Sequence, residues 1–471
     1  MKSKKIQLTA ILETVPADLE TPVSAFLKIA SGEKNCFLLE SAEQQEKIGR
    51  YSFIGVRPKS IISAVNGKIF EESVSGKKTA RTHTRIVDYL EERLNQYHLT
   101  NPQALPSFCG GLVGYLSYEN VAYFEDIKLQ PRKKLSIPEA IFFLTEDLVI
   151  FDHFKKTLSF VVLAEKPQTA KKRIQYLISK LRKPLMLSAN STSKKLGVKS
   201  NTTPAEFHKK VKAIKEYIRA GDCIQVVLSQ RFILPSVKND FQIYRALRSV
   251  NPSPYMFYFR SGNTRLIGSS PELLVKKSGN AAEVRPIAGT RPRGESPEKD
   301  LILEEQLKQS KKEMAEHLML VDLGRNDLGR VCEFDSIRVK NFARIERYSH
   351  VMHLVSDVNG KLKKGKSAFD LLKATFPAGT VTGAPKIRAM QIINELESDN
   401  RGPYAGCLGY FSFNQDMDMC ITIRTLMLDG KNIYLQAGAG IVKDSVPEKE
   451  FQETVNKAKA LLRAIERRGE F

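Results

Sequence analysis

Apolar residues recur at helical spacing directly after Thr203, and the flanking residues mark where this helix begins and ends. Thr203 is suited to cap the helix, with Pro204 at the first position and Glu206 completing a capping box. The apolar residues of one face are Phe207, Val211, Ile214 and Ile218. Gly221 ends the helix, and residues 223–232 are predicted to form a strand after it.

The chain divides at a polar stretch. Residues 1–186 alternate short apolar runs with turns, whereas residues 187–203 are rich in Ser, Thr, Asn and Lys and predict an exposed linker. Residues 204–471 mix predicted strands and helices, without an internal repeat. The 471 residues can bury a large core and could hold two or three compact units.

The chain is strongly basic, with a formal net charge of +22. A basic surface attracts phosphate, so a basic nucleic-acid-binding protein is a competing, non-enzyme interpretation. The lysines are spread along the chain, and no zinc-finger spacing or aromatic-basic RNA-binding signature occurs. A solvated basic surface without a nucleic-acid partner is therefore expected.

Cysteine usage and hydropathy indicate the compartment. The six cysteines show no Cys-x-x-Cys pairing, which argues against a disulfide framework or a zinc site. Glu13, Asp18 and Glu20 interrupt the apolar run after the N-terminal lysines, and no later segment approaches membrane-spanning length. We expect a soluble cytoplasmic protein without a membrane partner.

Residues 285–294 combine a stiff turn with fixed positive charge. The two glycines of this segment allow close backbone approach, and its prolines restrict the path of the chain. Arg285, Arg291 and Arg293 can each fork onto a carboxylate. The segment predicts a loop around a small anion, with a basic turn that faces water as the alternative.

Two pairs of glutamates are spaced three residues apart on predicted helices. Glu313 and Glu316 form one pair, and Glu450 and Glu453 form the other, with Lys457 one turn later. The apolar stripe expected on the second helix is Phe451, Val455, Ala458, Leu462 and Ile465. Four carboxylates brought together require a cation, and oxygen ligands suit Mg²⁺ better than zinc. Two ordinary solvated helix faces are the alternative.

Together these segments resemble the chorismate-utilising enzymes, and within that family most of all the component I anthranilate synthases. The resemblance covers nearly the whole chain and is concentrated in residues 286–294, 316–330, 348–353 and 436–440. It implies an α/β architecture of antiparallel β-sheets packed together with helices outside, and an N-terminal region that partly wraps the catalytic one. The expected divisions are residues 1–186, a linker at 187–203, and a chorismate-binding catalytic region at 204–471.

The resemblance also implies a metal and substrate site. Glu316 and Glu453 would be direct or near-direct ligands of Mg²⁺, with Glu313 and Glu450 reaching its waters. The ion would hold the ring carboxylate of chorismate, because Mg²⁺ keeps water and substrate oxygens in its shell. The implied substrate-binding residues are Gly289, Thr290, Thr380, Tyr404, Arg424, Gly438, Ala439, Gly440 and Lys457.

Catalytic roles are implied for Glu272, His353 and Thr290. Glu272 would be the general acid for departure of the C4 hydroxyl, which requires that its carboxyl be kept protonated. His353 would be the base that removes a ring proton as pyruvate leaves; a hydrogen-bonded core histidine is the alternative interpretation.

Two positions distinguish the sister activities. Gln225 takes the place of the lysine that activates water in isochorismate and salicylate synthases, and Ala288 takes that of a lysine nucleophile in many aminodeoxychorismate synthases. Ammonia is therefore the expected nucleophile. We expect the enzyme to be a lyase whose products are anthranilate and pyruvate. Some aminodeoxychorismate synthases also lack that lysine, so aminodeoxychorismate synthase component I stays as the alternative.

Ammonia needs a source, and the family suggests an effector. Cys407 lies in a turn that superficially resembles a glutaminase nucleophile, but the surrounding sequence belongs to the chorismate-binding match, so a separate glutamine amidotransferase subunit is the expected partner.

The segments that resemble a feedback site for L-tryptophan contain Glu40, Ser41, Pro254, Tyr255 and Met256. Glu40 would pair with the ammonium group of the effector, and the alternative is a plain turn and a core strand.

Overall fold

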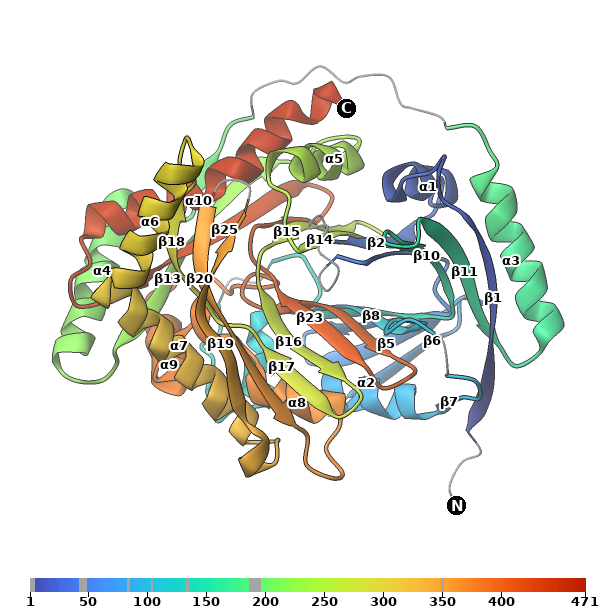
Figure 1. Cartoon of the computed structure of the whole chain (residues 1–471), viewed down its shortest axis with the longest axis horizontal. Helices are drawn as coiled ribbons and strands as arrows, with labels where there is room; N and C mark the ends of the chain where they lie inside the picture. Colours follow the sequence, from blue (N-terminus) through green and yellow to red (C-terminus); the bar gives the residue numbers. More distant parts are fainter. Residues whose placement is uncertain are drawn as a thin grey trace.

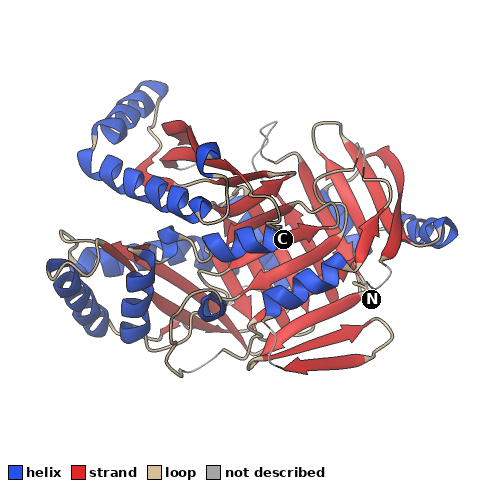
Figure 2. Ribbon diagram, turned by 90° about the horizontal axis from the view of Figure 1, so that it is seen from below, coloured by secondary structure: helices blue, strands red, loops and turns tan. Residues whose placement is uncertain are grey.

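Most strands of the protein belong to two large sheets, with helices at the periphery (Figures 1 and 2). The computed structural model describes residues 5–41, 49–82, 85–102, 105–132, 135–185, 196–348 and 351–471. Strand pairs are antiparallel with one exception, the parallel pair of β1 and β7 at a sheet edge. The predicted fold class, antiparallel sheets packed together with helices outside, is confirmed.

The first sheet has, in spatial order, β12 (Lys199–Ser200), β13 (Gln225–Pro235), β25 (Asn432–Ile441), β24 (Thr425–Leu428), β15 (Thr264–Ser270), β14 (Tyr255–Ser261), β2 (Asn35–Glu40), β3 (Tyr51–Val56), β10 (Asp147–Asp152), β11 (Thr157–Ala164), β1 (Ile6–Pro16) and β7 (Tyr97–Leu99), with β21 (Gly383–Ala384) paired to β13. The second has β18 (Ile287–Pro292), β20 (Val351–Lys361), β17 (Ala281–Val284), β16 (Leu273–Ser278), β23 (Met417–Ile421), β22 (Cys407–Ser412), β8 (Gly111–Leu116), β9 (Ala140–Thr145), β4 (Ser60–Val65), β5 (Lys68–Ser73) and β6 (Lys78–Thr82), with β19 (Arg338–Arg347) paired to β20.

The helices are α1 (Pro22–Ile29), α2 (Ile86–Asn95), α3 (Pro167–Leu181), α4 (Pro204–Arg219), α5 (Asp240–Val250), α6 (Pro297–Gln309), α7 (Lys311–Gly329), α8 (Ala368–Thr375), α9 (Lys386–Leu396) and α10 (Pro447–Glu466). Short 3₁₀ helices are η1 (Tyr118–Tyr123), η2 (Phe334–Ser336), η3 (Gly379–Val381) and η4 (Arg467–Glu470). Helices α4, α5, α9 and α10 pack on the β13–β25–β15 part of the first sheet, and α7 packs on β18 and β20 of the second.

Alternation along the strands builds two separate cores. In β2, Phe37 packs in the core between the sheets, whereas Cys36 and Leu38 pack under the outer helices. In β14, Phe257 belongs to the inner core and Tyr258 to the outer one. Successive side chains of a strand point to opposite faces, so a strand covered on both sides is apolar throughout.

Strands from both sides of the polar stretch at residues 187–203 pair within each sheet. In the first sheet β2 pairs with β14, and in the second β8 pairs with β22. The N-terminal region therefore continues the sheets of the C-terminal region. Residues 186–195 lie outside the described part of the chain, and two residues of the expected linker, Lys199 and Ser200, form the edge strand β12.

The local predictions can be compared residue by residue. The capping box of α4 is confirmed: Glu206 N donates to Thr203 Oγ1 at 3.3 Å, and the Glu206 carboxylate accepts from Thr203 N at 2.7 Å. The strand predicted from residue 223 begins at Gln225. The buried face of α10 is rotated from the expected stripe, and consists of Thr454, Ala458, Leu461, Ala464 and Ile465.

All six cysteines are buried and none forms a disulfide, as predicted. Within the described residues, no helix is both long and apolar enough to cross a membrane.

Candidate active site

A bulge in the pairing of β18 with β20 positions His353. The register shifts between Ala288 and Thr290, and Gly289 at the bulge has a φ of +62°, a conformation that glycine adopts without strain. Thr290 thereby lies opposite His353. His353 Nδ1 lies 2.9 Å from the carbonyl oxygen of Gly289 and 3.1 Å from Thr290 Oγ1.

These contacts fix the protonation of the imidazole. A carbonyl oxygen can only accept, so Nδ1 of His353 carries the proton and donates to Gly289. Nε2 is then the nitrogen with a free lone pair. Burial lowers the pKa of His353, helped by the nearby charge of Arg424, although the bond to Gly289 opposes the shift. The ring is neutral at physiological pH and can accept a proton at Nε2.

Glu272 lies between β15 and β16 and is buried. Burial raises the pKa of its carboxyl to about 7, against opposing effects of Thr380 and Lys457. Its backbone carbonyl accepts from Ile421 N at 3.0 Å, which fixes the main chain at this point. A carboxyl with this pKa can donate a proton near neutral pH.

Strand β25 presents an open stretch of backbone to the same region. A Cβ on Gly438 would lie 2.6 Å from Tyr404 Oη, and one on Gly440 would lie 2.3 Å from Gln225 Nε2. Lys457 Nζ donates to the carbonyl of Gly438 at 2.9 Å. The two glycines therefore make room for polar groups that project over the strand.

Arg424 connects these groups electrostatically. Burial lowers its pKa, and the nearby Tyr404 and Glu453 oppose the shift. Its Nη1 donates to the carbonyl of Lys457 at 3.3 Å. Because Arg424 also acts on His353, the imidazole, the guanidinium and the carboxylate of Glu453 border one region.

The four predicted glutamates project from α7 and α10, which lie on the same side of the molecule (Figure 1). Burial raises the pKa of Glu316, and the charges of Glu313 and Glu453 raise it further. Burial likewise raises the pKa of Glu450, with a further contribution from Glu453. The carboxylates of the two helices are thus close enough to repel one another.

Several neighbours moderate this repulsion, and the closest is Lys457, whose Nζ lies 2.6 Å from Glu453 Oε1. Gln225 Nε2 lies 3.5 Å from Glu316 Oε1, and the charge of Lys312 acts on both Glu316 and Glu450. Lys312 was not predicted from the sequence, although its spacing of four residues from Glu316 is a signal for such a contact. In the part of the chain that the structure describes, no three acidic, histidine or cysteine side chains are grouped closely enough to hold a metal ion.

The arginines of residues 285–294 form ion pairs with carboxylates of the same chain. Arg285 pairs with Glu346 and lies 3.4 Å from Asp357. Arg293 pairs with Asp300, and Arg291 lies 3.3 Å from Glu313. Each guanidinium group therefore has a carboxylate partner within the fold, and the role of these arginines in receiving a small anion stays a prediction.

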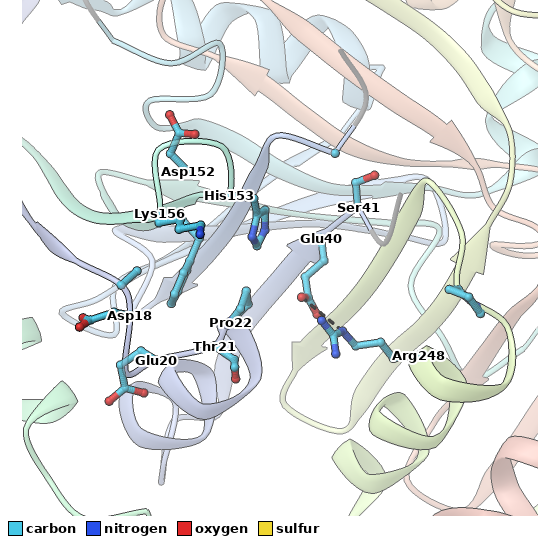
Figure 3. A pocket seen from close by; sticks show the side chains of 14 residues that line it. Asp18, Glu20, Thr21, Pro22, Glu40, Ser41, Asp152, His153, Lys156 and Arg248 are labelled. Carbon is cyan, nitrogen blue, oxygen red and sulfur yellow. Dashed lines mark ion pairs between the residues drawn. The ribbon is translucent and has the colours of Figure 1, made fainter. Parts of the chain in front are cut away.

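The predicted effector segments do come together. Pro254, Tyr255 and Met256 line a cavity of about 450 Å³ together with Glu40 and Ser41. Met256 lies opposite Glu40 in the pairing of β14 with β2. A second cavity, of about 640 Å³, shares Glu40 and Ser41 and opens towards His153 and Lys156 (Figure 3).

Glu40 itself is already paired. Its carboxylate accepts a hydrogen bond from Tyr244 and lies 3.5 Å from Arg248 Nε (Figure 3). Burial raises the pKa of Glu40. Ser41 Oγ is buried and makes no hydrogen bond with the residues that the structure describes. Of the family-like segment at residues 348–353, Ser349 and His350 lie outside the described residues.

Comparison with known proteins assigns the family. The model for chorismate-binding enzymes matches residues 34–463. The chain belongs to the chorismate-binding enzyme family. Anthranilate synthase component 1 from Aquifex aeolicus is 48% identical over 95% of this chain and 93% of that protein. The corresponding protein from Acetivibrio thermocellus is 43% identical over 99% of this chain and 97% of its own length.

A solved structure agrees with the sequence relatives. The crystal structure of anthranilate synthase component I from Streptococcus pneumoniae superposes with a TM-score of 0.81 at 35% identity, covering 96% of this chain and 99% of that one. The match to known members thus extends over both sheets and both regions of the chain.

The buried carboxyl of Glu272 predicts a component of the pH dependence of stability. Its pKa is about 7 in the fold against 4.5 as the reference value, so its contribution is full below pH 4.5 and is lost as the pH rises through 7. Between about pH 5 and pH 8 the free energy of unfolding of the wild type should fall by about 3 kcal/mol relative to Glu272→Gln.

Urea unfolding without divalent ions measures this difference. Glu466→Gln, at an exposed position of α10, is the control and should follow the wild type. Parallel curves for the wild type and Glu272→Gln would contradict the assignment.

Proposed function

We propose that the protein is the large subunit of an anthranilate synthase, which converts chorismate and ammonia to anthranilate and pyruvate in tryptophan biosynthesis. Family membership and the full-length relatives named anthranilate synthase component 1 support the proposal. Among the site residues, the side chains of Gln225 and Ala288 give the main support for this reaction over those of the sister enzymes. Gln225 offers an amide beside Glu316, and Ala288 is a buried methyl group, so neither supplies a base or a nucleophile.

The acid and base then have defined tasks. Glu272, with its raised pKa, protonates the departing C4 hydroxyl as ammonia adds at C2. His353 accepts the ring proton at Nε2 while Nδ1 stays bonded to Gly289, and pyruvate leaves. Thr290 helps to keep the ring in this orientation, because its hydroxyl lies 3.1 Å from Nδ1.

Substrate binding is assigned to the polar groups over β25. Arg424 and Tyr404 hold the enolpyruvyl carboxylate, with the backbone of residues 438–440. Thr380 lies near enough to Glu272 to lower its pKa and lines the same cleft. Lys457 adds positive charge while its bond to Gly438 fixes its position.

The carboxylates on α7 and α10 are the groups that would hold a divalent cation, because burial and mutual repulsion raise the pKa of Glu316 and Glu450 and a cation would offset both effects. Among the described residues these carboxylates stand too far apart for three of them to bind one ion, so binding requires their side chains to move closer together. Glu316 and Glu453 would hold Mg²⁺, with Glu313 and Glu450 binding its waters. The ion, when bound, supplies charge that fixes and neutralises the ring carboxylate.

A separate glutamine amidotransferase subunit would supply ammonia. Cys407 is unsuited to this task, because it is buried and burial raises the pKa of its thiol far above its usual value. The designation component 1 of the relatives agrees with a two-subunit enzyme. The six unpaired cysteines agree with a cytoplasmic location.

Product analysis tests the function. With chorismate, Mg²⁺ and ammonium, the purified protein should release anthranilate and pyruvate in equal amounts, followed by fluorescence and a coupled pyruvate assay. Accumulation of an aminated chorismate without pyruvate would assign the protein to the aminodeoxychorismate synthases. Salt-sensitive binding of nucleic acid without turnover would favour the non-enzyme interpretation.

Loss of one metal-binding carboxylate should damage activity without unfolding the protein. Glu316→Gln and Glu453→Gln should each lower kcat/KM by roughly 100-fold and raise the Mg²⁺ concentration needed for half activity, since an amide is a poorer ligand for a hard dication. Glu466→Gln, on the same helix as Glu453, should leave both values unchanged. A wild-type Mg²⁺ dependence in both site variants would remove these residues from the site.

Tryptophan should inhibit the enzyme through the cavity at Ser41. Ser41→Phe places a ring in that cavity and should relieve inhibition at roughly millimolar tryptophan while catalysis is kept, because inhibition requires tryptophan to favour one conformation. Ser41→Ala, which leaves the cavity open, is the matched control and should stay sensitive. Equal inhibition curves for the wild type and Ser41→Phe would reject the site.

A further inference from the structure

A buried ion pair lies directly behind the proposed substrate site. Arg401 is 1% exposed and Glu397 is 6% exposed. Nε of Arg401 donates to Glu397 Oε2 at 2.9 Å, and Nη2 donates to Oε1 at 2.7 Å. Burial alone would raise the pKa of Glu397, but Arg401 and Ser229 hold it below its usual value. The pair is therefore charged within the core.

Arg401 joins two segments that carry proposed site residues. Its Nη1 donates to the carbonyl of Val381 at 2.7 Å, in the 3₁₀ helix that contains Thr380. Its Nη2 donates to the carbonyl of Val227 at 2.8 Å, in the strand that begins with Gln225. Glu397 completes the connection, because its Oε1 accepts from N and Oγ of Ser229 at 2.9 and 2.7 Å.

The guanidinium also lies against two tyrosine rings. It is 4.9 Å from the ring centre of Tyr118 and 5.6 Å from that of Tyr404. The hydroxyl of Tyr404 reaches Gly438 in the substrate region. Contacts of this kind attract a cation to an aromatic face and are stronger when water is excluded.

The N-terminal region holds the same turn from the other side. The carboxylate of Glu119 accepts from Arg401 N at 2.6 Å and from Gly402 N at 3.1 Å, and Tyr118 N donates to the carbonyl of Gly402 at 2.9 Å. The backbone and the side chain of Arg401 are thus fixed by separate groups.

We propose that Arg401, paired with Glu397 and packed on Tyr118, is a positioning residue that sets the place of Tyr404 for binding chorismate. The inference rests on the proposed role of Tyr404. Arg401 does not touch the substrate; it acts through the ring on which its guanidinium rests. Removing it should weaken substrate binding more than it slows the chemical step.

A double-mutant cycle tests this role. Arg401→Lys and Tyr404→Phe should each raise the dissociation constant of chorismate, measured by calorimetry, and its KM by roughly tenfold, with a smaller change in kcat. The double variant should bind chorismate no more weakly than the single variant with the lower affinity, because both changes act through one contact, that of the Tyr404 hydroxyl with chorismate. Additive effects would overturn the proposal.

Substitution of Tyr118 is a second test of the positioning role, and it leaves the ion pair of Arg401 with Glu397 intact. Its hydroxyl has no hydrogen-bond partner among the described residues, so Tyr118→Phe should match the wild type. Tyr118→Leu removes the ring and should raise KM for chorismate several-fold, again without adding to Tyr404→Phe. An unchanged KM in Tyr118→Leu would also contradict the role.

A remote ion pair controls for lost stability. Arg173 of α3 lies 3.3 Å from Glu146 and pairs with Asp147, on the opposite side of the molecule from α10 (Figure 1). Arg173→Lys should lower the melting temperature but add independently to Tyr404→Phe. The mutant cycle measures the dissociation constant of chorismate, whereas the proposed reaction is tested by the identity of its products. A failure of the positioning role can therefore be distinguished from a failure of the proposed function.

Discussion

The pairing of β14 with β2 is the interaction on which the arrangement of both sites depends. It joins the N-terminal strands to the catalytic sheet and places Met256 opposite Glu40. The next pairing, of β14 with β15, puts Tyr255 opposite Ser270. Ser270 Oγ donates to the carbonyl of Ile421 at 2.7 Å, and Ile421 N donates to the carbonyl of Glu272. The cavity and the proposed acid are therefore separated by one strand pair and two hydrogen bonds.

Two buried carboxyl groups near the site have opposite properties because their partners differ. Glu397 receives Arg401 and the donors of Ser229, and its pKa stays low despite burial. Glu272 has only the opposing effects of Thr380 and Lys457, so burial raises its pKa to about 7. The same desolvation thus yields a permanent anion that orders the core and an acid able to give up its proton.

Features that depend on residues close together in the chain were predicted best from the sequence. The cap of α4 requires only Thr203 and Glu206, three residues apart, and it is confirmed. The carboxylate partners of Arg285 were not predicted, because Glu346 and Asp357 lie far away in sequence and reach it only in the folded chain. The buried face of α10 was misplaced for a similar reason, since its packing on β25 and α5 decides which residues are covered. The family-like segments indicated where the site lies, but not Lys312 or Arg401. Each has a glutamate four residues away in sequence, but their other contacts come from distant elements: Lys312 acts on Glu450 of α10, and Arg401 donates to the carbonyls of Val227 and Val381.

The glycines of the site show what the backbone contributes to its chemistry. A Cβ at Gly438 would meet the hydroxyl of Tyr404, and one at Gly440 would meet the amide of Gln225. At Gly289 it would lie 3.2 Å from the carboxylate of Glu313. At Gly438 and Gly440 the nearest atom belongs to a polar side chain, whereas at Gly289 the side chain of Leu307 lies nearer still, at 3.0 Å. Gly438 and Gly440 are needed because polar side chains from other elements approach the strand closely, and a larger residue would displace the groups proposed to bind substrate and to select the nucleophile. Gly289 is needed also because its φ of +62° is strained for any other residue.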